Sequence, residues 1–99
     1  PRPTVPDLRS FCHKSLAIAN DFLSPTETQN RRLGAIYLLY GLWSKAPMKN
    51  LKIRMTINEW ENLMSLRDSI YESQEFEAVF ILNKLIKKKA FAFCILKYE

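Results

Sequence analysis

A short apolar run near the middle of the chain limits the possible folds most strongly. Residues 33–43 read Leu-Gly-Ala-Ile-Tyr-Leu-Leu-Tyr-Gly-Leu-Trp and contain no charged side chain. A helix without a polar stripe has no side that water prefers, so its own domain or a partner must cover it. Eleven residues are too few to cross a bilayer, which needs about 20. The run therefore predicts a buried central helix rather than a membrane span.

Both glycines of the chain, Gly34 and Gly41, fall inside this run. Seven residues apart, they share one face of a helix. Each destabilises a helix by roughly 0.5–1 kcal/mol relative to Ala, so close packing of another backbone explains them better than chance. We predict a partner interface around them. Its aromatic members are Tyr37, Tyr40, Trp43 and Trp60. Such rings can also stack on bases, but helical spacing in an apolar run favours core or protein contacts.

Length and composition are those of one globular domain. The 99 residues are 47% hydrophobic and 25% charged, enough for one core and too few for two. The chain starts without Met, and we expect a single helical domain, residues 1–99, cut from a longer subunit. Its proline-rich start, residues 1–6, is expected to be an extended lead-in and lacks the apolar core of a signal peptide. Cys12 and Cys94 are interpreted as reduced core residues.

Apolar periodicity and capping signals predict the other helices. A first helix is expected over about residues 7–23. The central helix is expected over residues 25–45, because Ser24 and Glu27 match a capping box with Pro25 at the first helical position. This start would place Arg31 and Arg32 in the second turn, away from the positive end of the helix dipole. Pro47 should end this helix.

The second half begins with a short alternating segment. Residues 51–55 alternate between apolar and basic side chains, which predicts an extended segment. A second capping box, Thr56 to Glu59, should start a third helix. Its expected apolar stripe is Ile57, Trp60, Leu63, Met64, Ile70 and Tyr71. A fourth helix should follow Ser73 and end in the lysines at 87–89. Its expected apolar residues are Phe76, Val79, Phe80, Leu82, Leu85 and Ile86.

The last segment fits two structures. Residues 91–98 alternate as in a strand, yet the same residues also suit a helix. A strand would need a mate, and residues 51–55 are the only candidate, so we favour helix or irregular structure. The predicted fold class is all-α, a compact bundle of four to five helices around the buried central helix, with one short extended segment as a variant.

The chain carries little catalytic chemistry. His13 is its only histidine, and no Ser or Cys lies in a nucleophile motif. Two cysteines and one histidine cannot supply a structural zinc site, and no glycine-rich phosphate loop is present. The carboxylates between residues 59 and 77 fall on polar helix positions, so a solvated face is a better interpretation than acid–base catalysis. We predict a protein that is not an enzyme and that needs neither cofactor nor metal.

Charge is distributed unevenly along the chain. Four cations and no anion lie in residues 45–54, whereas residues 57–79 carry six carboxylates against Arg67 alone, a net charge of −5. The whole chain has a formal charge of +5, which favours an acidic partner such as nucleic acid. The candidate phosphate contacts are Arg31, Arg32, Lys45, Lys49, Lys52, Arg54, Lys87, Lys88 and Lys89. For Arg31 and Arg32, a solvated position and an acidic partner are alternatives.

Several segments together resemble a known family. They are residues 32–43, 52–55, 58–63 and 75–80, and the residues that follow position 80 as far as residue 93. In matching order, they resemble subunit 1 of the small nuclear RNA-activating protein complex (SNAPc), over about residues 11–93.

This resemblance implies a non-catalytic scaffold subunit in the nucleus. In that family the subunit joins a large Myb-repeat subunit and a third core subunit. The complex recognises the proximal sequence element of small nuclear RNA genes, which RNA polymerase II or III transcribes, and works with the TATA-binding protein. No membrane is involved. The resemblance assigns no DNA contact to individual residues. The alternative is a generic helical-repeat adaptor unrelated to transcription, which co-purification with a Myb-repeat protein would distinguish.

Overall fold

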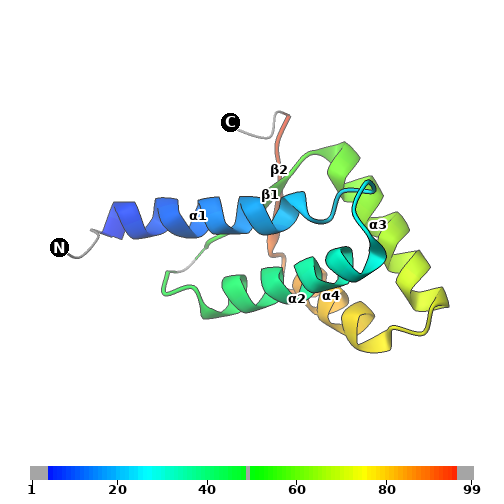
Figure 1. Ribbon diagram of the computed structural model, residues 1–99. Helices are drawn as coiled ribbons and strands as arrows, with labels where there is room; N and C mark the ends of the chain where they lie inside the picture. Colours follow the sequence, from blue (N-terminus) through cyan, green and yellow to red (C-terminus); the bar gives the residue numbers. More distant parts are fainter. Residues whose placement is uncertain (1–4, 49, 96–99) are drawn as a thin grey trace.

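The computed structural model describes residues 5–48 and 50–95, with side chains from residue 8 onward. The elements are α1 (Val5–Asp21), α2 (Gln29–Lys45), β1 (Ile53–Met55), α3 (Ile57–Glu72), α4 (Phe76–Lys87) and β2 (Phe91–Phe93). Helix α2 packs against α1 and α4, α3 against α4, and α1 against β1 (Figure 1). Because α1 already begins at Val5, the extended lead-in over residues 1–6 is wrong for its last two residues. Residues 1–4 lie outside the described part.

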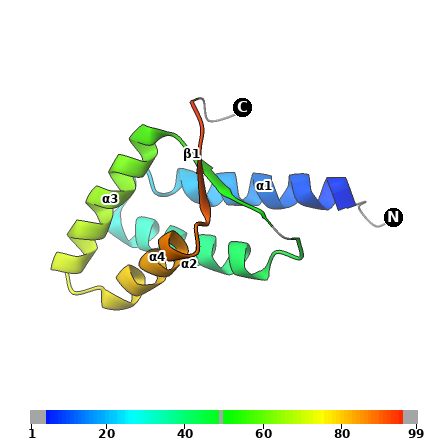
Figure 2. The same ribbon diagram turned by 180° about the vertical axis from the view of Figure 1, so that it is seen from behind.

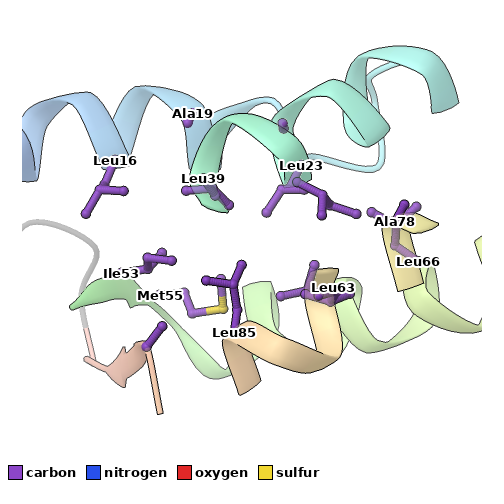
Figure 3. Close-up of a cluster of buried hydrophobic side chains, with 14 of the residues drawn as sticks. Leu16, Ala19, Leu23, Leu39, Ile53, Met55, Leu63, Leu66, Ala78 and Leu85 are labelled. Carbon is purple, nitrogen blue, oxygen red and sulfur yellow. The ribbon is translucent and has the colours of Figure 1, made fainter. Parts of the chain in front are cut away.

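One apolar core lies between two groups of elements. In Figure 3, Leu16 of α1, Leu23 in the turn after it and Leu39 of α2 face Ile53, Met55, Leu63 and Leu85 across the core. Ile53 and Met55 are fully buried, as are Ile70 and Leu85. A hydrophobic residue buried to this degree contributes roughly 1.5–3 kcal/mol. The core therefore uses every element, although β1 is only three residues long.

The start of α2 differs from the prediction. The helix begins at Gln29, and the hydroxyl of Thr28 accepts a hydrogen bond from the Arg31 N–H at 3.3 Å. Ser24 cannot cap a helix because its hydroxyl accepts from the Thr26 N–H inside a turn. A start at residue 25 is therefore wrong.

The later start puts two arginines in the first turn of α2, where cations oppose the helix dipole. Local contacts compensate. Arg31 forms an ion pair with Glu27 at 3.2 Å, and the Arg32 Nε donates to the Leu23 carbonyl at 3.0 Å. The predicted end is confirmed, since Ala46 is the C-cap residue before Pro47.

Within this chain α2 is covered on one side only. Ala35, Ile36 and Leu39 are buried, whereas Tyr37 is 40% and Leu38 48% exposed. The glycines also lack the expected close neighbour, since a Cβ built on Gly34 or Gly41 would meet no atom of another described segment within 4 Å. The described residues therefore cover α2 only in part.

The fold is mostly helical but not all-α, because β1 and β2 form a parallel two-stranded sheet. Figure 2 shows the two strands crossing the middle of the molecule. The Ile53 N–H donates to the Ala90 carbonyl at 2.7 Å, and the Cys94 N–H to the Met55 carbonyl at 3.1 Å. The extended segment at 51–55 is confirmed at its core, residues 53–55. The preference for helix or irregular structure after residue 90 is wrong for residues 91–93. Residues 91–93 pair with residues 53–55, which lie in the only segment that the sequence analysis identified as a candidate strand partner.

Helices α3 and α4 begin and end near their predicted positions, but their apolar stripes differ. The capping box of Thr56 and Glu59 is present. Four residues placed in the core by periodicity are exposed instead, namely Ile57, Tyr71, Phe76 and Phe80. A hydrophobic stripe wider than the core face leaves its outer members in water.

Both helices end in a Schellman motif closed by a residue other than glycine. Gln74 and Lys89 follow the C-caps and adopt φ values of 63° and 57°. After α4, the Lys89 N–H donates to the Ile86 carbonyl at 3.0 Å and the Ala90 N–H to the Leu85 carbonyl at 3.1 Å. The left-handed conformation favours glycine at both positions.

Replacing Lys89 by glycine should therefore stabilise the chain. We expect Lys89→Gly to raise the free energy of unfolding by about 0.5–1 kcal/mol, because glycine has no Cβ to strain the left-handed conformation. Lys88→Gly is the matched control. It removes the same charge at φ −83°, where glycine only adds backbone entropy to the unfolded state. Urea unfolding of the three proteins measures both effects, and equal destabilisation by the two variants would contradict the expectation.

Candidate functional site

Five basic residues come together where α1, β1 and the end of α4 meet. Arg9 and His13 lie one turn apart on α1, and the charges of Arg9 and Arg54 both act on His13. Arg54 is exposed in β1, and Lys52 directly precedes the strand, on the same side because side chains alternate along an extended chain. The Lys52 Nζ donates to the backbone carbonyl of Lys89, just after α4. We call Arg9, His13, Lys52, Arg54 and Lys89 the basic face.

His13 reports the electrostatics of this face. Partial burial, followed by the positive charges of Arg9 and Arg54, lowers the pKa of His13 below 6.5. The fold thus favours the neutral imidazole. Since the unfolded chain takes up the proton first as pH falls, the contribution of His13 to stability decreases below about pH 6.5. A phosphate placed between these cations would act in the opposite direction and raise the pKa.

Only some of the predicted phosphate contacts reach this face. Lys52, Arg54 and Lys89 belong to it, and Lys87 and Lys88 are exposed beside Lys89. Lys45 is exposed at the far end of α2 from Arg31 and Arg32, so these three cations do not form one cluster. Lys49 lies outside the described residues. Sequence reasoning missed Arg9 and His13, although their spacing of four residues on a predicted helix was a usable signal.

Three of the predicted interface aromatics are engaged inside the chain. The Trp43 Nε1 donates to the Leu51 carbonyl at 2.8 Å. The Trp60 ring packs edge-on against Phe91 and Phe93, at centroid distances of 5.4 and 5.3 Å. The Nζ of Lys84 lies 5.6 Å from the centre of the Tyr40 ring. These three side chains therefore contribute to the fold itself, whether or not they also contact a partner.

The other members of the predicted interface lie on the uncovered side of α2. Gly34 and Tyr37 are exposed, and Gly41 is half-buried on the same side. Leu38, which sequence reasoning did not select, is exposed between the two glycines. The spacing of these residues at i, i+3, i+4 and i+7 gives one ridge along the helix. We call Gly34, Tyr37, Leu38 and Gly41 the α2 ridge.

A second group of exposed aromatics lies where α3 meets α4. The rings of Tyr71 and Phe76 pack edge-on at 5.5 Å, and Phe80 follows one turn later on α4. The hydroxyl of Tyr37 approaches this group from α2, because the carboxylates of Glu77 and Glu75 act on it. Desolvation, followed by these carboxylates, raises the pKa of Tyr37. We call Tyr37, Tyr71, Phe76 and Phe80 the aromatic face.

Sequence reasoning placed three members of the aromatic face in the core. A helical wheel would have predicted the exposure of Phe76, because at 100° per residue Phe76 lies about 180° from Leu85. Leu85 is fully buried, so a residue on the opposite side of α4 has to face outward.

Carboxylates and cysteines have structural surroundings. The Glu59 carboxylate accepts from the Thr56 N–H at 2.9 Å and from the amide of buried Asn20 at 3.2 Å. In the described part of the chain, no three His, Cys, Asp or Glu side chains are placed to hold a metal ion. Cys12 and Cys94 are free and half-buried. No helix among the described residues is long and apolar enough to span a membrane.

Comparison with known proteins finds a family to which the sequence is similar. The family model described as small nuclear RNA activating complex (SNAPc), subunit 1, matches residues 2–99. Proteins named snRNA-activating protein complex subunit 1 from Mus musculus and Homo sapiens are each 33% identical to the chain over 84 residues. That is 84% of this chain, and 22% and 23% of the two relatives. The chain thus spans less than a quarter of their length.

The pKa of His13 provides a direct test of the basic face. NMR titration of the only histidine should give a pKa below 6.5, and Arg54→Gln should raise it because one neighbouring positive charge is lost. Lys45→Gln is the control, since Lys45 is not among the groups that shift His13. A His13 pKa that does not respond to Arg54→Gln would show that the two residues do not share one electrostatic site.

Proposed function

Because the chain belongs to the family of subunit 1 of the small nuclear RNA-activating complex, we propose that it is a non-catalytic scaffold subunit of such a complex. The observation that carries this proposal is the family match over nearly the whole chain, residues 2–99. The complex would act in the nucleus at the proximal sequence element of small nuclear RNA genes, for RNA polymerase II and III. The partners would be a large Myb-repeat subunit, a third core subunit and the TATA-binding protein.

The exposed apolar residues support a scaffold role. The described residues include eleven large hydrophobic side chains that are at least 40% exposed. Single exposed residues of this kind are ordinary, but patches of them mark protein interfaces. The α2 ridge is one such patch, and its glycines let a partner backbone approach closely. Tyr40, Trp43 and Trp60 would stiffen the domain behind the ridge and contribute whatever ring surface they leave accessible.

The basic face would add non-specific attraction to DNA. Its cations come from α1, from β1 and the residue before it, and from the turn after α4. Each phosphate that they neutralise adds about 0.9 to the salt dependence of binding. Such contacts position a protein on DNA without reading its sequence. Lys45, Lys87 and Lys88 could extend the contact. Arg31 and Arg32 are weaker candidates because both are already held by groups of their own chain.

The alternative, a helical adaptor unrelated to transcription, lacks this support from the family. One experiment decides between the two. The chain is co-expressed with the Myb-repeat and third core subunits of a small nuclear RNA-activating complex, and the mixture is purified through a tag on the Myb-repeat subunit. Stoichiometric recovery of the chain supports the proposal. Elution of the folded chain without either subunit overturns it.

Substitutions in the α2 ridge should separate partner binding from stability. In the free chain Gly41→Leu should not lower the melting temperature, since Leu has higher helix propensity and no atom of another described segment lies within 4 Å of the Cβ position. The same substitution should weaken recovery with the partner subunits, because the leucine occupies the space into which a partner backbone would pack. Ser65→Leu, which adds a leucine at an exposed position of α3, is the control. Unchanged recovery of the Gly41→Leu variant would count against a partner contact at the α2 ridge.

A charge substitution should change the salt dependence of DNA binding. For the assembled complex on a duplex carrying the proximal sequence element, Arg54→Gln should lower the slope of log K against log salt by about 0.9, if Arg54 neutralises one phosphate. Arg31→Gln should leave the slope unchanged, because Arg31 is paired with Glu27. Mobility-shift titrations at several salt concentrations measure both slopes. The reverse ranking of the variants would move the DNA contact to the start of α2.

A further inference from the structure

We propose that the aromatic face is a docking surface for a basic amphipathic helix of a partner protein. This proposal rests on the scaffold function above and adds to it the place and the chemistry of one contact. It concerns Tyr37, Tyr71, Phe76 and Phe80, which lie on α2, α3 and α4 away from the basic face.

The apolar part of the face is large and exposed. Tyr71 is 60%, Phe76 54% and Phe80 66% exposed, and Tyr37 adds a fourth ring that is 40% exposed. An aromatic side chain can bury about 150–250 Å², and clustered aromatics are the usual anchors of protein interfaces. The Tyr71 and Phe76 rings are in contact and Phe80 lies one turn from Phe76, so these rings form a patch of the kind that a monomeric protein rarely leaves in water.

The face is also rigid. Only residues 73–75 separate α3 from α4, and two hydrogen bonds fix this turn. The Gln74 N–H donates to the Tyr71 carbonyl at 3.0 Å and the Glu75 N–H to the Ile70 carbonyl at 2.9 Å. The Tyr71 and Phe76 rings are packed across the turn, so a partner would lose little free energy in ordering them.

Charge indicates the occupant. Residues 68–83 contain four carboxylates and neither Lys nor Arg. The carboxylates are those of Asp68, Glu72, Glu75 and Glu77, and all four residues are exposed. Lysine and arginine side chains pair with carboxylates and also bind the faces of aromatic rings. DNA would instead be repelled by these charges. A cationic protein segment is therefore the complementary ligand.

The secondary structure of the face indicates a helical ligand. The face is built from helices, whose backbone groups are bonded internally and offer no strand edge to an extended peptide. Phe76 and Phe80 are one turn apart, a spacing that matches apolar side chains at i and i+4 or i+7 of a second helix. Leucines on one side of that helix would contact the rings, while its lysines and arginines would reach the carboxylates.

A designed peptide tests the proposal on the 99-residue chain. The probe is a fluorescent 18-residue helix with leucines on one side and arginines on the other, and its binding is followed by anisotropy. We expect the double variant Phe76→Ala/Phe80→Ala to weaken binding at least tenfold. Phe11→Ala should leave the affinity within twofold, because Phe11 is as exposed as Phe80, 66% in both cases, but lies on α1.

A second pair of variants tests the charge. Glu72→Lys should weaken binding of the arginine peptide at least threefold without loss of stability, since a cation is favoured in the last turn of a helix. Glu61→Lys, in the first half of α3, should have a smaller effect. Equal binding of a peptide with glutamates in place of arginines would overturn the proposal, as would an equal loss in Phe11→Ala.

Two further outcomes separate this proposal from the scaffold function. If the Phe76→Ala/Phe80→Ala variant is recovered with the partner subunits as efficiently as the original chain, and the arginine peptide does not bind, the docking surface is refuted while the scaffold function stands. If sedimentation shows a dimer of the original chain that this variant abolishes, the face binds a second copy and the proposal is wrong. Loss of both peptide binding and partner recovery in the variant supports it.

Discussion

The pairing of β1 with β2 is the contact on which the rest of the structure depends. It joins residues 53–55 to residues 91–93 and thereby turns α3 and α4 into a crossover between two parallel strands. The sheet alone would be marginal, because two short strands bury little surface. It is held by the packing of side chains from both strands. Ile53 and Met55 are fully buried in the core, and the ring of Trp60 packs against Phe91 and Phe93 on the other strand.

The same pairing gives the domain two chemically different ends. It brings the end of α4 next to β1, so the lysines after α4 join Lys52 and Arg54. The opposite end of α4 carries Phe76 and Glu77. A helix of 12 residues is about 18 Å long at 1.5 Å per residue. A single side chain or phosphate of a ligand therefore cannot contact the basic face and the aromatic face at the same time. The helix dipole supports this arrangement, with a carboxylate in the first turn of α4 and lysines in the last.

Local sequence rules predicted most helix boundaries, and they failed where a competing hydrogen bond or a distant contact decides. The box at Thr56 was predicted correctly, and the similar pattern at Ser24 failed because a turn hydrogen bond occupies the hydroxyl. The strand at residues 91–93 depends on a partner 38 residues earlier, and no local pattern distinguishes it from a helix. For the site, charge patterning found Lys52 and Arg54. The contribution of α1 to the same face required the packing of α1 on β1.

The glycines of α2 connect the energetics of the fold to its function. Two glycines inside a helix destabilise it by roughly 1–2 kcal/mol in total relative to alanine, a considerable part of the 5–15 kcal/mol that holds a typical domain together. A close neighbour that required them would be the ordinary explanation, but no atom of another described segment lies within 4 Å of either Cβ position. Neither glycine adopts a positive φ, so backbone conformation does not require them. Tyr37 and Leu38 are exposed on the same side of the helix. Uncovered apolar side chains beside glycines that the fold does not need are the observation on which the proposed partner contact at α2 rests.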